Sequence, residues 1–208
     1  MKLTKKLLSE PFAKGAAQIM RYACYFAMAF MVLSLILSCM GRITFTLHSQ
    51  DGTYDRAIYA EEDHAPKSRG LTINVKDDVH VWTNEENEID VLTQAGLSVM
   101  YAFQIVPLIF AYWLLGRVFS NVHKGQIFTE QNARYLLGYG LLQFFVALFV
   151  PFIKLFVCWI TTLISSSRLS ISTGHEMLTT LIPSIAFIVA AYIIHYGIHL
   201  QDEVDHTL

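Results

Sequence analysis

This chain contains long apolar runs and short stretches in which apolar and polar residues alternate. Four runs contain no Asp, Glu, Lys or Arg: Tyr22–Gly41, Val91–Gly116, Tyr135–Ile153 and Met177–Ile194. A bilayer core about 30 Å thick is crossed by roughly 20 apolar residues in a helix. A helix also satisfies its own backbone hydrogen bonds, for which hydrocarbon offers no partners. The four runs therefore predict four transmembrane helices.

The segment after the first run alternates apolar and polar residues, as a half-buried strand does. Arg42–His48 and Leu71–Val75 each show this period of two, and Val79–Trp82 follows closely enough to form a short hairpin with the second. Turns are predicted at Ser49–Asp55 and Glu61–Gly70, which contain Gly or Pro. Since about fifty residues without a cysteine make a thin core, we expect this sheet to lean on the outer helix ends.

Together these elements predict an all-α integral membrane protein, a four-transmembrane-helix bundle with a small β-rich extracytoplasmic insertion between helices 1 and 2. Composition agrees, because 15% of the residues are charged against about 25% in soluble domains. The sequence has no stripe of basic residues with interleaved aromatic residues, so direct nucleic-acid binding is not expected. The expected boundaries are a cytoplasmic N-terminus at 1–21, transmembrane helix 1 at 22–41, the extracytoplasmic segment at 42–90, transmembrane helix 2 at 91–118, a cytoplasmic loop at 119–129, a long transmembrane helix 3 at 130–165, an outer loop at 166–176, transmembrane helix 4 at 177–200 and a cytoplasmic tail at 201–208.

The placement of lysine and arginine predicts the orientation, since both are enriched in cytoplasmic segments. Five of them precede the first run, and Arg117, Lys124 and Arg134 lie between the second and third runs. Gly41–Asp90 instead has five basic residues against eleven acidic ones. Both termini are therefore predicted to be cytoplasmic, with Gly41–Asp90 outside.

Two residues near the predicted outer surface have two interpretations each. Ile36–Cys39 loosely resembles the site where bacterial lipoproteins are cleaved and acylated, but Leu37 fits it poorly. The run is also longer than the apolar region of a signal peptide, which has 7–15 residues. A retained crossing is favoured over acylation at Cys39.

Lys154 lies about 30 Å along a helix from Arg134, which places it at the outer interface. It becomes an intramembrane charge of functional interest if that helix projects inward.

A group of histidines marks the end of the last helix. His195, His199, Asp202 and His206 are spaced by four, three and four, so a continuing helix places them on one face. Such groups are suitable zinc or nickel ligands, but no second motif completes a site, and an interfacial polar cap is the favoured interpretation. We expect no metal and no cofactor. Since no zinc-protease, serine-hydrolase or phosphate-loop motif occurs, we expect a non-enzymatic protein.

The inner loop carries the most specific local pattern. Gly125 suits a left-handed helix end, Thr129 is a good N-cap and Glu130 suits the first turn of the next helix. Phe128 is placed to staple onto Ala133. The third helix is therefore predicted to begin at Glu130.

Two stretches carry a resemblance to a known family. Gly125–Arg134 and Gly197–Leu208 resemble the two recurrent signatures of a bacterial membrane family catalogued as a domain of unknown function (family 2975). His206 departs from the leucine usual in that tail. The resemblance implies four crossings, an outside segment after the first, and a bacterial inner membrane. Members often occur beside a small helix-turn-helix regulator, which implies a signalling role.

The two signatures suggest a cytoplasmic docking platform. Acidic residues near a helix C-terminus oppose its dipole, so we expect them to bond to the loop, with Asn132 or Arg134 as partner and Arg134 with Asp205 or Glu203 as the favoured pair. The platform residues are Gly125, Phe128, Asn132, Arg134, Gln201, Glu203 and Asp205.

The favoured function is a membrane sensor or regulatory partner that docks a cytoplasmic regulator protein. The alternative is a small transporter or immunity-type protein acting on a peptide or lipid in the bilayer, which needs a polar path through the crossings. Lys154, Gln104 and Gln143 are the residues that the sequence offers for one. A membrane enzyme would need a metal at the histidine group. The lipid bilayer is the other expected partner, and a homo-oligomer is left open.

Overall fold

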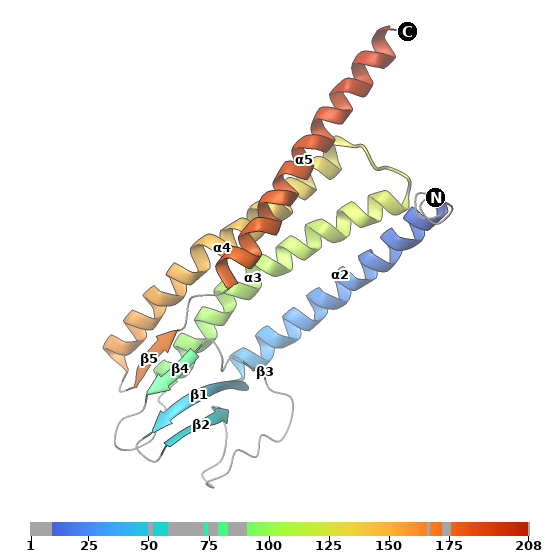
Figure 1. Cartoon of the computed structure of the whole chain (residues 1–208). Helices are drawn as coiled ribbons and strands as arrows, with labels where there is room; N and C mark the ends of the chain where they lie inside the picture. Colours follow the sequence, from blue (N-terminus) through green and yellow to red (C-terminus); the bar gives the residue numbers. More distant parts are fainter. Residues whose placement is uncertain are drawn as a thin grey trace. The chain divides into compact units, whose positions relative to one another are not determined.

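The computed structural model describes residues 10–49, 52–57, 73–74, 79–82, 91–165, 167–171 and 176–207. Its long helices are α2 (Glu10–Cys39), α3 (Val91–His123), α4 (Glu130–Ile164) and α5 (Glu176–Thr207) (Figure 1). Each contains a segment long and apolar enough to cross a membrane. These segments are Pro11–Cys39, Val91–His123, Glu130–Ile164 and Thr179–Leu200.

Large apolar side chains on the outside of these helices support a lipid environment. One example from each helix is Phe26, Phe110, Phe152 and Ile193, which are 76%, 58%, 61% and 66% exposed. A soluble protein rarely exposes large continuous apolar surfaces, whereas lipid tails cover them without cost. The protein is therefore a multi-pass membrane protein.

The helices extend further than the predicted spans. Helix α2 begins at Glu10, within the expected N-terminal segment, and α3 continues to His123. Helix α5 continues through the expected tail to Thr207. The predicted bounds were set by charged residues, and charge limits the part of a helix inside hydrocarbon but not the helix itself. Helix α4 begins at Glu130, where the loop pattern predicts it.

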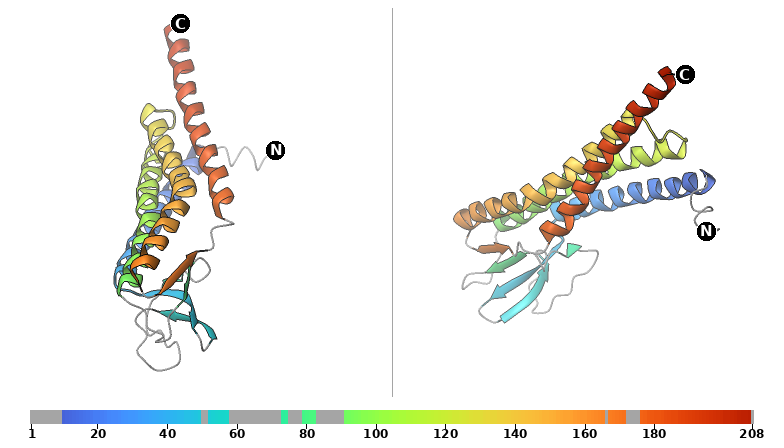
Figure 2. Two further views of the ribbon diagram at one scale, coloured as in Figure 1. Left: turned by 90° about the vertical axis from the view of Figure 1, so that its left-hand side faces the viewer. Right: turned by 45° about the horizontal axis from the view of Figure 1, so that its top comes forward.

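In the described residues, five short strands form one sheet: β1 (Ile43–Ser49), β2 (Gly52–Ala57), β3 (Ile73–Asn74), β4 (Val79–Trp82) and β5 (Arg168–Ile171). The order is β2-β1-β4-β5, with β3 paired to the start of β1 (Figure 2). The predicted alternation of β1 is confirmed, because its apolar residues are buried and the polar ones between them are half-buried.

Three details of the predicted sheet are wrong. Strand β4 pairs in parallel with β1, not as a hairpin with β3. The hairpin that does form joins β1 to β2: the chain reverses between Ser49 and Gly52, within the predicted turn, but strand β2 itself is not predicted. Gly52 adopts a φ of 138°, a conformation open to glycine, and begins a strand instead of breaking one. The expected outer loop at 166–176 contains β5, which is antiparallel to β4.

The chain forms two compact units. The helical unit comprises Met1–Phe30, Pro107–Ala147 and Leu178–Leu208, and the sheet unit comprises Met31–Val106 and Leu148–Met177.

The sheet unit has its own hydrophobic core. The inner face of β1, β4 and β5 packs on α3 and α4, and the thiol of Cys158 donates to the backbone oxygen of Leu169 at 2.8 Å. Cys158 and Cys39 are both free, so no disulfide joins them. The buried residues of this core are Ile43, Phe45, Leu47, Val79, Val81, Leu97, Met100, Cys158 and Leu169.

The helical unit has a separate core to which all four helices contribute. Helices α4 and α5 approach each other closely at Gly140 of α4, where an added Cβ would lie 3.0 Å from the amide nitrogen of Ile188 and 3.1 Å from the carbonyl oxygen of Ser184. Small residues allow such contact between membrane helices. The buried residues of this core are Cys24, Ala111, Leu115, Val118, Leu136, Tyr139 and Ala191.

Candidate functional site

Helix α3 ends in a motif that satisfies its last carbonyl groups. The amide of Gly125 donates to the oxygen of Val122 at 2.9 Å, and the amide of Gln126 donates to the oxygen of Asn121 at 3.0 Å. These two bonds make a Schellman motif, which requires a left-handed residue directly after the helix. Gly125 supplies it with a φ of 83°, as its position in the sequence predicts.

Thr129 caps the start of helix α4. Its Oγ1 accepts a hydrogen bond from the amide of Asn132 at 3.2 Å, which satisfies a donor that the helix cannot. In the first turn, Arg134 Nη2 donates to Glu130 Oε1 at 2.6 Å. Both of these side chains are exposed, so the ion pair adds only a few tenths of a kcal/mol.

Asn132 holds the two helix ends together from inside the loop. Its side chain is fully buried. Its Nδ2 donates to the backbone oxygens of Gln126 at 2.7 Å and Ile127 at 3.0 Å, and its Oδ1 accepts from Asn121 Nδ2 at 2.8 Å. Both amide hydrogens are used within the loop and the side chain does not reach the surface, while its place in the predicted platform stays a prediction. Its role is to fix the loop.

His123 connects this loop to helix α2. Its Nδ1 lies 3.1 Å from the backbone oxygen of Lys14, and since a carbonyl only accepts, Nδ1 carries the proton. The start of α2, the end of α3 and the start of α4 therefore form one surface of the helical unit.

Two apolar side chains remain on the outside of the loop. Ile127 is 44% exposed and Phe128 is 61% exposed, in a turn whose backbone is fixed from within. Most of the Phe128 side chain is exposed, so a contact with Ala133 would cover only a small part of the ring. The loop thus displays an apolar pair on a fixed backbone.

The tail half of the predicted platform belongs to the last turns of α5. The side chains of Gln201, Glu203 and Asp205 lie outside the described residues. The pairing of Arg134 with Glu203 or Asp205 stays a prediction, while Arg134 has Glu130 as a partner.

The histidine group is described in part. His195 and His199 are exposed, and their rings meet edge to face with centroids 5.0 Å apart. Asp202 and His206 have side chains outside the described residues. Elsewhere in the described chain, no three His, Cys, Asp or Glu side chains are placed to hold a metal.

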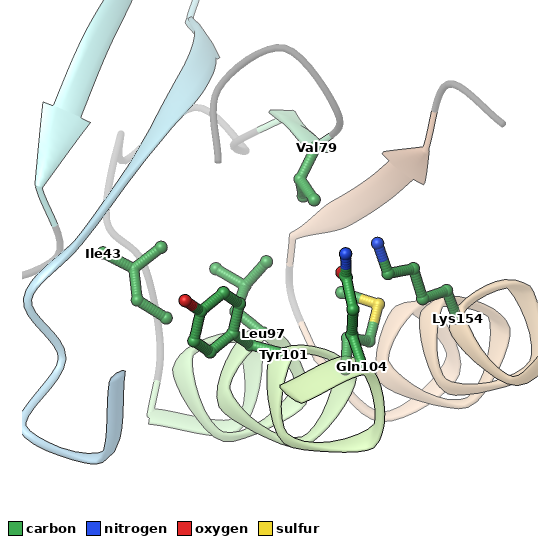
Figure 3. A pocket seen from close by; sticks show the side chains of 7 residues that line it. Ile43, Val79, Leu97, Tyr101, Gln104 and Lys154 are labelled. Carbon is green, nitrogen blue, oxygen red and sulfur yellow. The ribbon is translucent and has the colours of Figure 1, made fainter. Parts of the chain in front are cut away.

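A pocket lies in the sheet unit, between the start of strands β1 and β4 and the helices α3 and α4. Its volume is about 20 Å³, which is room for about one water molecule. Figure 3 shows the amide of Gln104 and the ammonium of Lys154 reaching the same end of the pocket, while Tyr101 points toward Ile43. Two of the three residues proposed for a polar path thus meet here. The third, Gln143, donates to Tyr139 Oη at 3.3 Å within the helical unit. The remaining lining residues are apolar: Val79, Leu97 and Met100.

Sequence reasoning missed a polar cluster on the sheet. His48 Nε2 lies 2.9 Å from His80 Nδ1, and His48 Nδ1 lies 3.0 Å from Thr53 Oγ1. The ring of Trp82 stacks on that of His48 with centroids 4.0 Å apart. His48 and His80 occupy the polar phase of two predicted strands, but only the parallel register of β1 and β4 brings them together.

Comparison with known proteins agrees with the resemblance carried by the loop and tail. The model of a protein family of unknown function, DUF2975, matches residues 66–208. The chain belongs to this family. The match spans the pocket residues of α3 and α4, the inner loop and α5. No curated protein and no solved structure matches the chain.

Proposed function

We propose that this DUF2975 protein is a non-enzymatic membrane sensor or regulatory partner in a bacterial inner membrane, and that it docks a cytoplasmic protein at the α3–α4 loop. The observation that carries the proposal is the buried Asn132 network, which fixes the backbone around the exposed side chains of Ile127 and Phe128. A loop fixed before binding loses less conformational entropy when a partner arrives. Exposed aromatic and aliphatic side chains are frequent anchors of protein interfaces.

The charges around the loop support a cytoplasmic position. Lys14 lies on α2 next to His123, Lys124 directly follows α3, and Arg134 lies near the start of α4. Lysine and arginine gather on the cytoplasmic side of membrane proteins. The Ile127–Phe128 pair therefore faces a compartment in which regulators of transcription are found.

Site-specific photo-crosslinking tests this function. A photoreactive residue is placed at Phe128, and in a matched protein at Phe110, which is similarly exposed but lies in the apolar span of α3. We expect a discrete cytoplasmic protein to be captured from position 128 and lipid from position 110. The captured protein should then leave the membrane fraction when Ile127→Ser and Phe128→Ser are combined.

A control separates docking from loss of the protein. The double variant must reach the membrane at the wild-type level, and Phe110→Ala must retain the captured partner. If position 128 captures only lipid, the apolar pair is an interfacial membrane anchor and the docking proposal fails. Retention of the partner by the double variant would also contradict it.

A further inference from the structure

Two histidines link the central strands of the sheet. Strand β1 lies between β2 and β4, and β4 in turn pairs with β5 (Figure 1). The pairing of β1 with β4 is short, with three residue pairs in register. On its polar face, His48 Nε2 of β1 lies 2.9 Å from His80 Nδ1 of β4. A hydrogen bond between two imidazole rings therefore spans this pairing.

This hydrogen bond depends on how many protons the two rings carry. A neutral imidazole has one N–H group and one acceptor nitrogen, whereas imidazolium has two N–H groups and no acceptor. When both rings are neutral, or one is charged, one of the facing nitrogens donates and the other accepts. When both are charged, two N–H groups face each other and no hydrogen bond forms between them. Other contacts of His48 leave this count unchanged, since it concerns only the two facing nitrogens.

The surroundings of His48 accommodate the first of these charges. Thr53 Oγ1 lies 3.0 Å from His48 Nδ1 and can accept its proton. The ring of Trp82 is stacked on that of His48 with centroids 4.0 Å apart, and the face of an indole attracts a cation. An imidazolium at position 48 keeps both hydrogen bonds, because it donates in each. The first proton thus leaves the contact of β1 with β4 intact, and only the second one breaks it.

The neighbouring strands add charged residues to this face. Arg168 of β5 is in register with Trp82 and is exposed, so it brings a further positive charge to the polar side of the sheet. Asp55 of β2 is in register with Thr46, and its side chain lies outside the described residues. Helices α3 and α4 pack on the opposite, apolar face. Two imidazolium rings in contact therefore repel each other on a face that already carries Arg168, and this repulsion favours separation of β4 from β1.

We propose that the sheet is an acid-sensitive switch, in which protonation of both His48 and His80 separates β4 from β1. The bond that breaks joins His48 Nε2 to His80 Nδ1, and the protons come from solvent, which both half-buried side chains reach. Beneath this pairing Leu47 and Val81 are fully buried, so its opening uncovers part of the sheet core. In the orientation that the sequence predicts, this face meets the medium outside the membrane, whose pH follows the surroundings. The switch does not depend on the cytoplasmic docking surface.

The switch is tested with the full-length protein in a mild detergent between about pH 8 and pH 5, where histidine changes its charge. Trp113→Phe and Trp159→Phe leave Trp82 as the tryptophan whose fluorescence is followed. We expect its emission to fall when His48 becomes charged, since imidazolium quenches a stacked indole. Quenching by acrylamide should increase when β4 separates. Amide exchange in β1 and β4, followed by mass spectrometry, should rise severalfold relative to α3, which corrects for the effect of pH on exchange itself.

Variants isolate the second proton. In His80→Asn the amide can donate or accept near the place of Nδ1 but takes up no proton in this pH range, so β1 and β4 should stay paired in acid. The fall in Trp82 emission should remain in this variant, because His48 still becomes charged, and should be lost in His48→Gln. His195→Asn, which removes an exposed histidine of α5, is the matched control and should open as the wild-type protein does.

Three results would overturn the switch. One is unchanged amide exchange in β1 and β4 of the wild-type protein over the whole pH range, which requires no variant to fold. Another is equal opening of the wild-type protein and a folded His80→Asn variant, which would assign the response to other groups. The third is an equal rise of exchange in α3 with loss of helical circular dichroism, which would show acid unfolding of the whole chain.

Discussion

At the scale of single residues, the inner loop shows which roles the sequence reveals. Gly125 and Thr129 act on backbone groups within a few positions, so their spacing alone predicts what they do. Asn132 has a partner, Asn121, on another helix eleven positions earlier, and no local pattern indicates such a contact. A polar residue in the first turn of a capped helix indicates a surface position, whereas Asn132 is buried.

Replacement of Asn132 by alanine is expected to loosen this loop. The change leaves the oxygens of Gln126 and Ile127 and the amide of Asn121 without their partner. Buried polar groups without partners cost about 1–3 kcal/mol. The free energy of unfolding should fall by about that amount, and trypsin should cleave after Lys124 faster than in the wild-type protein, measured in detergent by gel and mass.

Gln131→Ala is the matched control for that change. Gln131 is exposed and its amide donates to Tyr135 Oη at 2.8 Å on the helix surface. Exposed positions of this kind change stability by less than about 0.5 kcal/mol. Equal effects of the two substitutions would show that the buried network contributes nothing to the loop.

Zinc binding at the end of α5 is a second prediction at this scale. His195 and His199 come from one helix and supply two imidazoles, half of the four ligands that a structural zinc site needs. We expect purified protein to retain no stoichiometric zinc after dialysis, as measured by elemental analysis. Tight uptake that is lost in His199→Ala would overturn this expectation.

At the scale of elements, the long helices are more predictable than the strands. Runs of twenty apolar residues leave the helix as the structure that satisfies its own backbone in lipid. Strands choose partners elsewhere in the chain, and nothing in Val79–Trp82 indicates whether it pairs with β3 or with β1. Strand β5 is four residues long and lies in an expected loop. It cannot be recognised from the local sequence, because its partner β4 is separated from it by two crossings.

The packing of α4 on α5 gives a prediction for Gly140. A Cβ at this position would lie 3.0 Å from the amide nitrogen of Ile188 and 3.1 Å from the oxygen of Ser184, and these backbone atoms move only if the helices separate. Overpacking of this kind typically costs about 1–3 kcal/mol. Gly140→Ala should therefore lower the unfolding temperature in detergent, followed by circular dichroism.

Gly197→Ala provides the comparison within α5. Nothing lies within 4 Å of a Cβ added there. Alanine is the better helix former by up to about 1 kcal/mol, so this variant should be as stable as the wild-type protein or more so. A stable Gly140→Ala protein would show that the close approach of the two helices is dispensable.

At the scale of the whole molecule, the sequence predicts the membrane class and leaves the chemistry open. Charge segregation and apolar runs are properties of composition over long stretches, so they can be recognised from the sequence without knowledge of contacts. The pocket around Lys154 needs residues from two strands and two helices, and no spacing rule joins them. The same holds for His48 and His80.

Labelling of introduced cysteines tests the orientation of the molecule. Asp78→Cys should react with an impermeant maleimide in intact cells, and Lys124→Cys only after the membrane is opened, because basic residues gather inside. The background protein should carry Cys39→Ser, since Cys39 is exposed and free. Reaction of Lys124→Cys in intact cells would contradict the four-crossing arrangement.

The pairing of β4 with β5 has a consequence for biosynthesis. Val79 is in register with Ile171, 92 positions later in the chain, and α3 and α4 lie between them. During translation, β4 is completed long before its partner leaves the ribosome, and an unpaired strand edge invites association with other chains. Closure of the sheet therefore waits until the third crossing has been inserted and its far end delivered to the same side. The complete sheet therefore forms only in chains whose crossings α3 and α4 have both been inserted. A nascent chain that stalls within α4 still has an unpaired edge on β4.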